Sequence, residues 1–318
     1  MAYKGEFGFI EMIRRQFDIP EDMLGIGDDC AVIQSGDCEI LYSTDMLLEG
    51  VHFLRDASSP EDIGWKSLAV NLSDIAAMGG TPVATFLSIA LPETARGEWA
   101  KRFIAGYAEL SKKLDVPLLG GDTTSSPRDI CINVGILGRT PHGKSIKRST
   151  AAEGHSIYVT GQLGDSACGL HAILKDWDMT PEISTLIQVH MKPTPRISEG
   201  QALMKTGIVG AMMDISDGIA SDLRHILKAS GVGAEIDLDR IPLSDNLTTA
   251  CHFHNMDPLL LAAGGGEDYE LLFTAHEGIE TLLQFPVYKI GRIVSGSGLT
   301  WIRNGCSVDF DIKGFNHF

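Results

Sequence analysis

Aspartates that close apolar runs beside glycine, serine or threonine are the residues of this chain whose setting most clearly indicates chemistry. Seven share this setting: Asp28, Asp29, Asp45, Asp74, Asp122, Asp214 and Asp217. A carboxylate at the mouth of a buried strand or helix loses its hydration and needs a partner. Because no lysine or arginine lies inside these motifs, the expected partner is a hard divalent cation. Mg²⁺ prefers a few carboxylates together with waters and substrate phosphates, so the pattern predicts an enzyme that handles phosphates through metal ions.

Each aspartate motif also has a simpler interpretation. Asp28 and Asp29 follow two glycines, where a plain turn would suffice. A helix N-terminus favours acids such as Asp217 for its own reasons. Asp74 is harder to explain as a surface residue, because its neighbours in the expected helix are apolar. Together, the motifs favour a metal site.

Three other segments could contribute to a site. The glycine-rich run at 264–270 reads either as a flexible loop or as a backbone-lined pocket in which Glu267 contacts a ligand. His52 follows Asp45 closely enough to be a phosphate or substrate contact. Residues 138–145 match the pattern of a phosphate-binding P-loop, but a strand is expected within a dozen residues and leaves no room for the required helix. We therefore interpret this segment as a linker loop whose Lys144 and Arg148 could still reach a nucleotide.

Composition narrows the class of protein. A net charge of −16 argues against nucleic acid and anionic membranes as partners, and a phosphorylated substrate would need bound metal to reverse the local charge. The N-terminus lacks the apolar core of a signal peptide, and the longest apolar stretch, at 83–92, is about half of a membrane span. The cysteines show no Cys-x-x-Cys pairing and are expected to be reduced thiols of a cytoplasmic protein.

The elements that must position these residues alternate between strands and helices, which predicts an α/β or α+β fold. A serine cap and a proline at the first helical position mark one helix start at Ser59. The expected helices cover 6–17, 59–78, 98–114, 166–175, 181–204 (broken at Pro193 and Pro195) and 218–230. The expected strands cover 31–33, 39–44, 83–90, 116–119, 130–137, 157–160, 209–213, 234–238, 270–274, 288–294 and 299–302. The irregular stretch near 139–154 predicts a boundary between two domains, residues 1–140 and 154–318, joined by a linker at 141–153.

Several long segments occur in an order that resembles one family over nearly the whole chain. They are GIGDDCAVI, STDMLLEGVHF, KSLAVNLSDIAAMGGTP, GGDTT, YVTGQLGDSACGL, DISDGIASDL, GGEDYELLFT and KGFNHF. The chain resembles the thiamine-monophosphate kinases of the AIR-synthase-like ATP-binding superfamily. This resemblance implies a fold of two α/β domains, the first of which forms a homodimer interface. It also implies ATP-dependent phosphorylation of thiamine monophosphate to thiamine diphosphate, with several Mg²⁺ ions.

The resemblance also implies roles for individual residues. The implied metal ligands and their helpers are Asp29, Ser43, Thr44, Asp45, Asp74, Asp122, Asp214 and Asp217. The implied ATP contacts are Gly121, Asp122, Arg148 and Ser216. The implied thiamine monophosphate contacts are His52, Glu267 and Phe315, while Asp28 would support the site.

The expected chemistry is direct in-line transfer. The attacking atom would be a phosphate oxygen that is already ionised at neutral pH, so we expect neither a general base nor a phospho-enzyme, and positioning and charge stabilisation carry the reaction. Two alternatives stay open: another ATP-dependent member of the superfamily, of the cyclo-ligase or selenophosphate synthetase type, or a non-catalytic protein that binds Mg²⁺ or Ca²⁺. No EF-hand spacing supports the latter.

Overall fold

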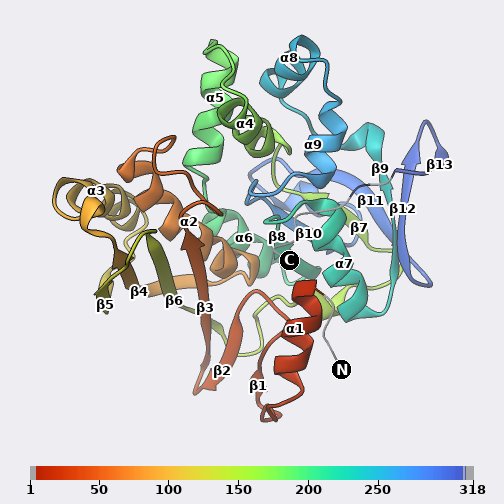
Figure 1. The fold of residues 1–318 in the computed structure, drawn as a ribbon. Helices are drawn as coiled ribbons and strands as arrows, with labels where there is room; N and C mark the ends of the chain where they lie inside the picture. The colour runs from red at the N-terminus through yellow and green to blue at the C-terminus, as the bar shows by residue number, and fades with distance from the viewer. Residues whose placement is uncertain (1–4, 311, 313–318) are drawn as a thin grey trace.

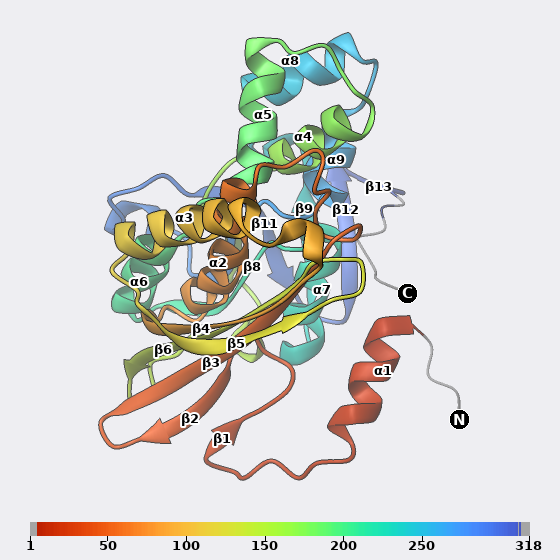
Figure 2. The same ribbon diagram turned by 60° about the vertical axis from the view of Figure 1, so that its left-hand side comes forward.

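Two β-sheets, built from separate halves of the chain, carry the helices that surround the candidate site (Figures 1 and 2). The structure is a computed structural model that describes residues 5–310 and 312. The first sheet has the strand order β1-β2-β3-β6-β4-β5, and only β4 and β5 pair in parallel. Its strands are β1 (Met23–Leu24), β2 (Ala31–Ser35), β3 (Cys38–Leu48), β4 (Thr81–Leu91), β5 (Leu118–Ser125) and β6 (Cys131–Pro141).

Helix α2 (Pro60–Ala77) is the central element between the two halves. Ser59 caps it, because the Ser59 side chain accepts the Asp62 N–H at 3.1 Å, and Pro60 fits the first turn. The helix ends before Gly79, whose φ of +70° suits glycine. Nearly every residue of α2 is buried, because it contacts the first sheet, α3 (Glu98–Lys113), α6 (Ile197–Thr206) and β8 (Val209–Asp214).

The second sheet has the order β13-β12-β9-β11-β7-β10-β8. Its remaining strands are β7 (Ser156–Val159), β9 (Gly233–Asp237), β10 (Leu271–Ala275), β11 (Tyr288–Val294), β12 (Gly298–Arg303) and β13 (Cys306–Val308). The largest hydrophobic cluster joins residues of the first sheet and α2 to Tyr158, Met212 and Phe273 of the second sheet. The core is therefore continuous from one sheet to the other, with α2 in its middle.

The remaining helices frame the site. They are α1 (Gly5–Arg14), α4 (Asp165–Leu174), α5 (Pro181–Met191), α7 (Ile219–Ser230), α8 (Asp245–Phe253) and α9 (Pro258–Gly264). Helix α7 packs into the second hydrophobic cluster with the strands, and α4, α5 and α8 share a smaller cluster of their own. Among the described residues, no helix is long and apolar enough to cross a membrane.

Most expected elements are present, but one strand is displaced and several short elements were not expected. The strand expected at 116–119 begins at Leu118 and runs to Ser125, so the GGDTT motif lies inside it. Helices α8 and α9 were not expected from the sequence. No α-helix follows residues 138–145 in the described chain: a three-residue 3₁₀ turn at Arg148–Thr150 leads into β7. The segment therefore lacks the helix that a P-loop requires, and its first four residues belong to β6.

Candidate active site

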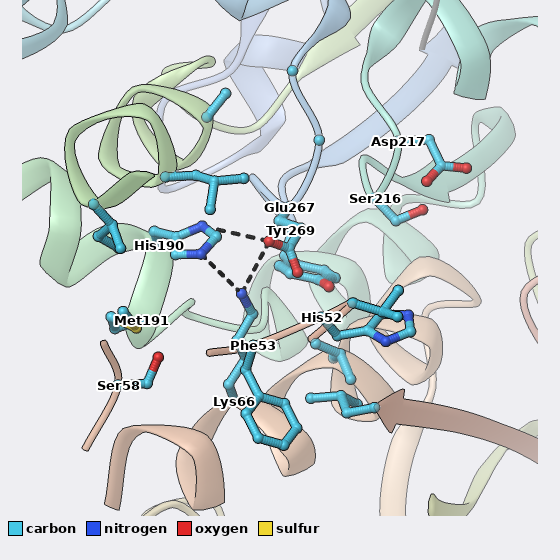
Figure 3. Close-up of a pocket in the computed structure, with 18 of the residues that line it drawn as sticks. His52, Phe53, Ser58, Lys66, His190, Met191, Ser216, Asp217, Glu267 and Tyr269 are labelled. Carbon is cyan, nitrogen blue, oxygen red and sulfur yellow. Dashed lines mark hydrogen bonds and ion pairs between the residues drawn. The ribbon is translucent and has the colours of Figure 1, made fainter. Parts of the chain in front are cut away.

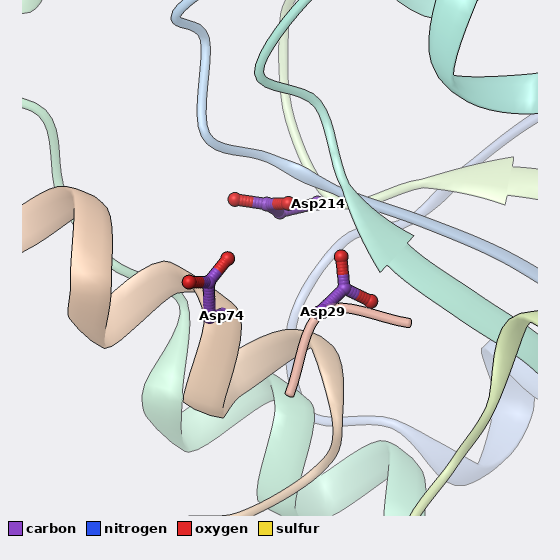
Figure 4. Close-up of side chains that lie close together, drawn as sticks. All are labelled: Asp29, Asp74 and Asp214. Carbon is purple, nitrogen blue, oxygen red and sulfur yellow. The ribbon is translucent and has the colours of Figure 1, made fainter. Parts of the chain in front are cut away.

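Three carboxylates from distant parts of the chain converge between the two sheets (Figure 4). Asp29 precedes β2, Asp74 lies near the end of α2, and Asp214 ends β8. One oxygen from each lies within 4.8 Å of the others. The convergence follows from the central position of α2, which contacts both sheets.

The contacts of these carboxylates leave room for a cation. Ser43 Oγ donates a hydrogen bond to Asp74, and Ser73 Oγ donates to Asp214 Oδ2 at 2.5 Å. Asp29 Oδ2 is buried and accepts no hydrogen bond from any described residue. A buried, unpaired carboxylate oxygen is costly, and three carboxylates with hydroxyl neighbours form the donor set that a hard divalent cation prefers. The residues therefore fit Mg²⁺.

The pKa values of the acids in this region are displaced upwards. Burial, reinforced by the charge of Asp29, raises the pKa of Asp214 to about 7 and that of Asp45 to about 6. Burial and then Asp29 raise the pKa of Asp28 to about 7. Burial, followed by the other carboxylates, raises the pKa of Asp74 well above its ordinary value. Without a cation, the cluster retains protons near neutral pH.

Asp28 and Asp29 have a basic partner, Arg148, which the sequence did not assign to them. Its guanidinium donates to Asp29 Oδ1 and its Nε lies 3.9 Å from Asp28 Oδ1, while its backbone N–H donates to both Asp28 oxygens at 3.2 and 3.3 Å. Burial acts to lower the pKa of Arg148, but the two carboxylates outweigh it and raise that pKa. The expectation that these acids lack a basic partner was wrong, because the partner lies about 120 residues further along the chain.

The other expected metal residues lie at different distances from the cluster. Asp45 lines the same cavity as Asp74 and Asp214, and its N–H donates to Asn71 at 3.0 Å. Asp217 also lines this cavity. Ser43 contacts Asp74, whereas Thr44 is exposed and accepts from Asn133 at 2.8 Å.

Asp122 and Gly121 lie on β5, at the far edge of the first sheet. Asp122 pairs with Ser88 of β4, which pairs with Asn133 of β6, which in turn pairs with Met46 of β3. Three strand spacings, about 14 Å, therefore separate Asp122 from β3. The Asp122 side chain is exposed and is not part of the carboxylate cluster.

A cavity of about 1090 Å³ opens beside the cluster. It brings together acids that were expected to bind metal with residues that were expected to bind substrate. Its polar lining includes the acids Asp45, Asp74 and Asp214. Figure 3 labels further polar residues of the lining: His52, Lys66, His190, Ser216, Asp217, Glu267 and Tyr269. The His52 ring is held by the Leu48 N–H, which donates to His52 Nδ1 at 3.0 Å. Phe315 lies outside the described residues.

A charged network that the sequence did not predict forms one wall of this cavity. Lys66 Nζ donates to Glu267 Oε2 at 3.0 Å and lies 3.5 Å from His190 Nε2, while His190 Nδ1 lies 3.4 Å from the same Glu267 oxygen (Figure 3). Burial acts to raise the pKa of Glu267, but Lys66 and His190 outweigh it and lower that pKa. Burial, then Lys66, lowers the pKa of His190 to about 4. The available sequence signal was that Lys66 is the sole basic residue of helix α2, Pro60–Ala77.

The segment that carries Glu267 connects several helices. Asp268 accepts the N–H groups of Gly164 and Ser166, at 2.8 and 3.3 Å, where α4 begins. Glu270 accepts from Arg196 Nε at 2.8 Å, just before α6. With Glu267 bonded to Lys66 of α2, the three acids of this segment each fix a different helix at the site.

This segment also runs beside the end of β8. The Glu267 N–H donates to Ser216 O at 2.8 Å, and the Tyr269 N–H donates to Ile215 O at 2.9 Å. Glu267 and Tyr269 have φ values of +65° and +51°, a strained conformation for residues other than glycine. The backbone is therefore held in a costly geometry where the cavity is lined.

Comparison with known proteins matches both halves of the chain. Residues 27–140 match the family model "AIR synthase related protein, N-terminal domain", and residues 152–302 match "AIR synthase related protein, C-terminal domain". The chain is 42% identical to the thiamine-monophosphate kinase of Salmonella typhimurium, over 99% of this chain and 98% of that protein. It is 36% identical to the thiamine-monophosphate kinase of Aquifex aeolicus, with the same coverage.

The fold is also similar to solved structures. A structure described as AaThiL complexed with AMPPCP and TMP superimposes with a TM-score of 0.89 at 36% identity, covering 99% of this chain and 97% of that one. A HypE–HypF complex matches with a TM-score of 0.75 at 20% identity, over 96% of this chain and 99% of that one, and shares the fold alone.

Proposed function

Because this chain belongs to the thiamine-monophosphate kinase family, we propose that it transfers the γ-phosphoryl group of ATP to thiamine monophosphate, giving thiamine diphosphate and ADP. The observation that carries this proposal is the cluster of Asp29, Asp74 and Asp214 beside a cavity of about 1090 Å³. Such a cavity is at the upper end of ordinary ligand sites. The AMPPCP and TMP named for the structural relative are an ATP analogue and the phosphate acceptor.

The residues present fit several Mg²⁺ ions, as the unpaired Asp29 oxygen and the converging carboxylates indicate. The proposed ligands and supporting oxygens are Asp29, Ser43, Thr44, Asp45, Asp74, Asp122, Asp214 and Asp217. When bound, Mg²⁺ would neutralise phosphate charge and favour in-line attack. Through its ion pair with Asp29, Arg148 orients that carboxylate and supplies a fixed positive charge beside it.

The acceptor needs no proton removed by the protein. A phosphate monoester has its second pKa near 6, so its oxygens are ionised at neutral pH. One acceptor oxygen forms a bond to the γ-phosphorus while the bond from that phosphorus to the bridging oxygen of ADP breaks. The protein's own contribution is to bind both substrates in line and to exclude water. We propose Gly121, Asp122, Arg148 and Ser216 as ATP contacts and His52, Glu267 and Phe315 as contacts of thiamine monophosphate.

We further propose that the active form is a homodimer that pairs the first sheets of two copies. Support comes from exposed apolar residues on that sheet: Leu119 on edge strand β5 is 66% exposed and Met46 on β3 is 56% exposed. Such pairing would place a partner against β5, where Gly121 and Asp122 lie. The six cysteines are free thiols, which supports a reducing compartment such as the cytoplasm. We keep residues 1–140 and 154–318 as the proposed domains, with 141–153 as their linker.

Product analysis tests the proposed activity. The purified protein is incubated with thiamine monophosphate, ATP and Mg²⁺, and the products are separated. Thiamine diphosphate and ADP in equal amounts, both abolished by EDTA, are expected. ADP with free phosphate and no thiamine diphosphate would contradict the assigned acceptor. A labelled phospho-enzyme trapped during turnover would contradict direct transfer.

A further inference from the structure

Lys66 is a buried cation whose position is not explained by stability. It lies in the middle of α2, and its side chain is only 4% exposed. Removing an ammonium group and a carboxylate from water costs more than their attraction usually returns, and an apolar pair of similar volume is often at least as stable. The neighbours Trp65 and Leu68 are apolar and buried. A buried lysine paired with the partly exposed Glu267 at the wall of the cavity therefore indicates a role at the site.

The contacts of Glu267 show what this role is. Both Lys66 Nζ and His190 Nδ1 approach the same carboxylate oxygen, Oε2, at 3.0 and 3.4 Å. The other oxygen, Oε1, accepts no hydrogen bond from residues 5–310 and 312. The carboxylate is thus held on one side and can accept a hydrogen bond on the other.

Lys66 also determines the hydrogen-bonding state of His190. An ammonium group has only donors, so Lys66 Nζ, 3.5 Å from His190 Nε2, requires that nitrogen to be the acceptor. The proton of the neutral ring is then on Nδ1, which faces Glu267 Oε2 at 3.4 Å and Ser166 Oγ at 3.1 Å. The hydrogen bond of Nδ1 is with Ser166 Oγ, so Lys66 is the group that donates to Glu267 and also sets the orientation of the His190 proton.

We propose that Lys66 is a positioning residue that acts through Glu267: it holds the carboxylate so that Oε1 accepts a hydrogen bond from the amino group of the thiamine pyrimidine. This inference rests on the proposed function and on Glu267 as a contact of thiamine monophosphate. A neutral or mobile side chain at 267 would not provide the same fixed acceptor. Direct contact between Lys66 and a substrate phosphate is disfavoured, because the Lys66 side chain is buried and two of its three donors face Glu267 and His190.

A double-mutant cycle tests this inference. Steady-state constants are measured for wild type, Lys66→Met, Glu267→Gln and the double variant, with each substrate varied in turn. Lys66→Met is expected to raise KM for thiamine monophosphate by roughly tenfold or more, the value of one hydrogen bond to a charged group. KM for ATP should change far less, and kcat by less than KM. The double variant should be no worse than Glu267→Gln alone, because Lys66 acts through the carboxylate.

Three results would overturn the inference. They are additive effects in the double variant, equal rises in KM for both substrates, and a loss confined to kcat. If Lys66→Met is insoluble because it leaves a carboxylate unpaired, the double variant can still be measured, since the double variant carries neither charge. Its KM for thiamine monophosphate is then compared with that of Glu267→Gln alone. Lys289→Met is the matched control, because Lys289 forms a 2.8 Å ion pair with Glu277 outside the cavity. If wild type makes no thiamine diphosphate, the proposed function fails; if wild type is active and Lys66→Met matches it, only this inference fails.

Discussion

Replacing Asp214 by asparagine should stabilise the metal-free protein while it impairs the enzyme. Burial, then Asp29, raises the pKa of Asp214 from 3.8 to about 7 in the folded state. Below the unfolded pKa of 3.8 the carboxyl is protonated in both states and this cost is absent. The cost grows as pH rises from 3.8 toward about 7 and is constant above that, at roughly 4 kcal/mol. Asparagine has the same shape and no such cost.

The expected gain is smaller than this upper value. The Ser73 hydrogen bond to Asp214, at 2.5 Å, becomes a neutral one and loses about 1 kcal/mol. Relaxation of the cluster removes part of the remainder, so we expect about 2 kcal/mol at about pH 8 in EDTA, and close to none at about pH 4. Turnover with Mg²⁺ and ATP should fall by on the order of 10²-fold, the typical loss of a strong electrostatic stabiliser.

Urea denaturation in EDTA at both pH values measures the first effect, and product formation measures the second. Asp245→Asn, an exposed position in the first turn of α8, controls for the chemical change itself. Excess Mg²⁺ should stabilise wild type more than Asp214→Asn. A variant that is less stable than wild type in EDTA at the higher pH would refute the argument, because it would mean that the buried Asp214 carboxylate does not destabilise the fold when it ionises.

Three further results are expected. Asp74→Asn should lower turnover by on the order of 10²-fold, whereas Lys144→Ala, in the exposed linker, should stay within a few-fold; equal damage in a turnover assay would revive the phosphate-loop interpretation. The pKa values of Asp45 and Asp214 are raised to about 6 and about 7, so the apparent Mg²⁺ affinity should fall as pH is lowered from about 8 to about 6, and Mg²⁺ binding should release protons. Calorimetry in buffers of different ionisation enthalpy measures the number of protons released. Binding of Mg²⁺ without proton release would contradict this prediction. The Arg196→Met substitution removes the ion partner of the Glu270 carboxylate, which is largely buried. It should lower the free energy of unfolding by about 3 kcal/mol, measured by urea titration. An unchanged urea midpoint would show that this ion pair does not contribute to stability.

The sequence predicted most elements because their signals are local. Ser59 and Pro60 mark the start of α2, and the apolar spacing of α3 marks that helix. The edge strand β5 was placed too early, because its glycines and polar residues lack the alternation of a half-buried strand. Helix α9 is too short for a periodic signal, and α8 lies in a polar stretch.

The site was predicted by residue type rather than by arrangement. The expected acids Asp29, Asp74 and Asp214 do converge, as their apolar surroundings suggested. Their basic neighbour Arg148 and the network of Lys66 depend on contacts between distant parts of the chain, which no local pattern encodes. Whether the expected residues carry the roles that the family resemblance implies stays a prediction.

The pairing of Lys66 with Glu267 has a consequence for synthesis of the chain. The two residues are 201 positions apart, so at 5–20 residues per second the ribosome takes roughly 10–40 s to add the second after the first. During that interval α2 carries an ammonium group whose counter-ion does not yet exist. The nascent first half also cannot complete its core, because Tyr158, Met212 and Phe273 of the second half belong to the same hydrophobic cluster. Early termination before residue 267 should yield a fragment that is captured or degraded rather than a partly active enzyme.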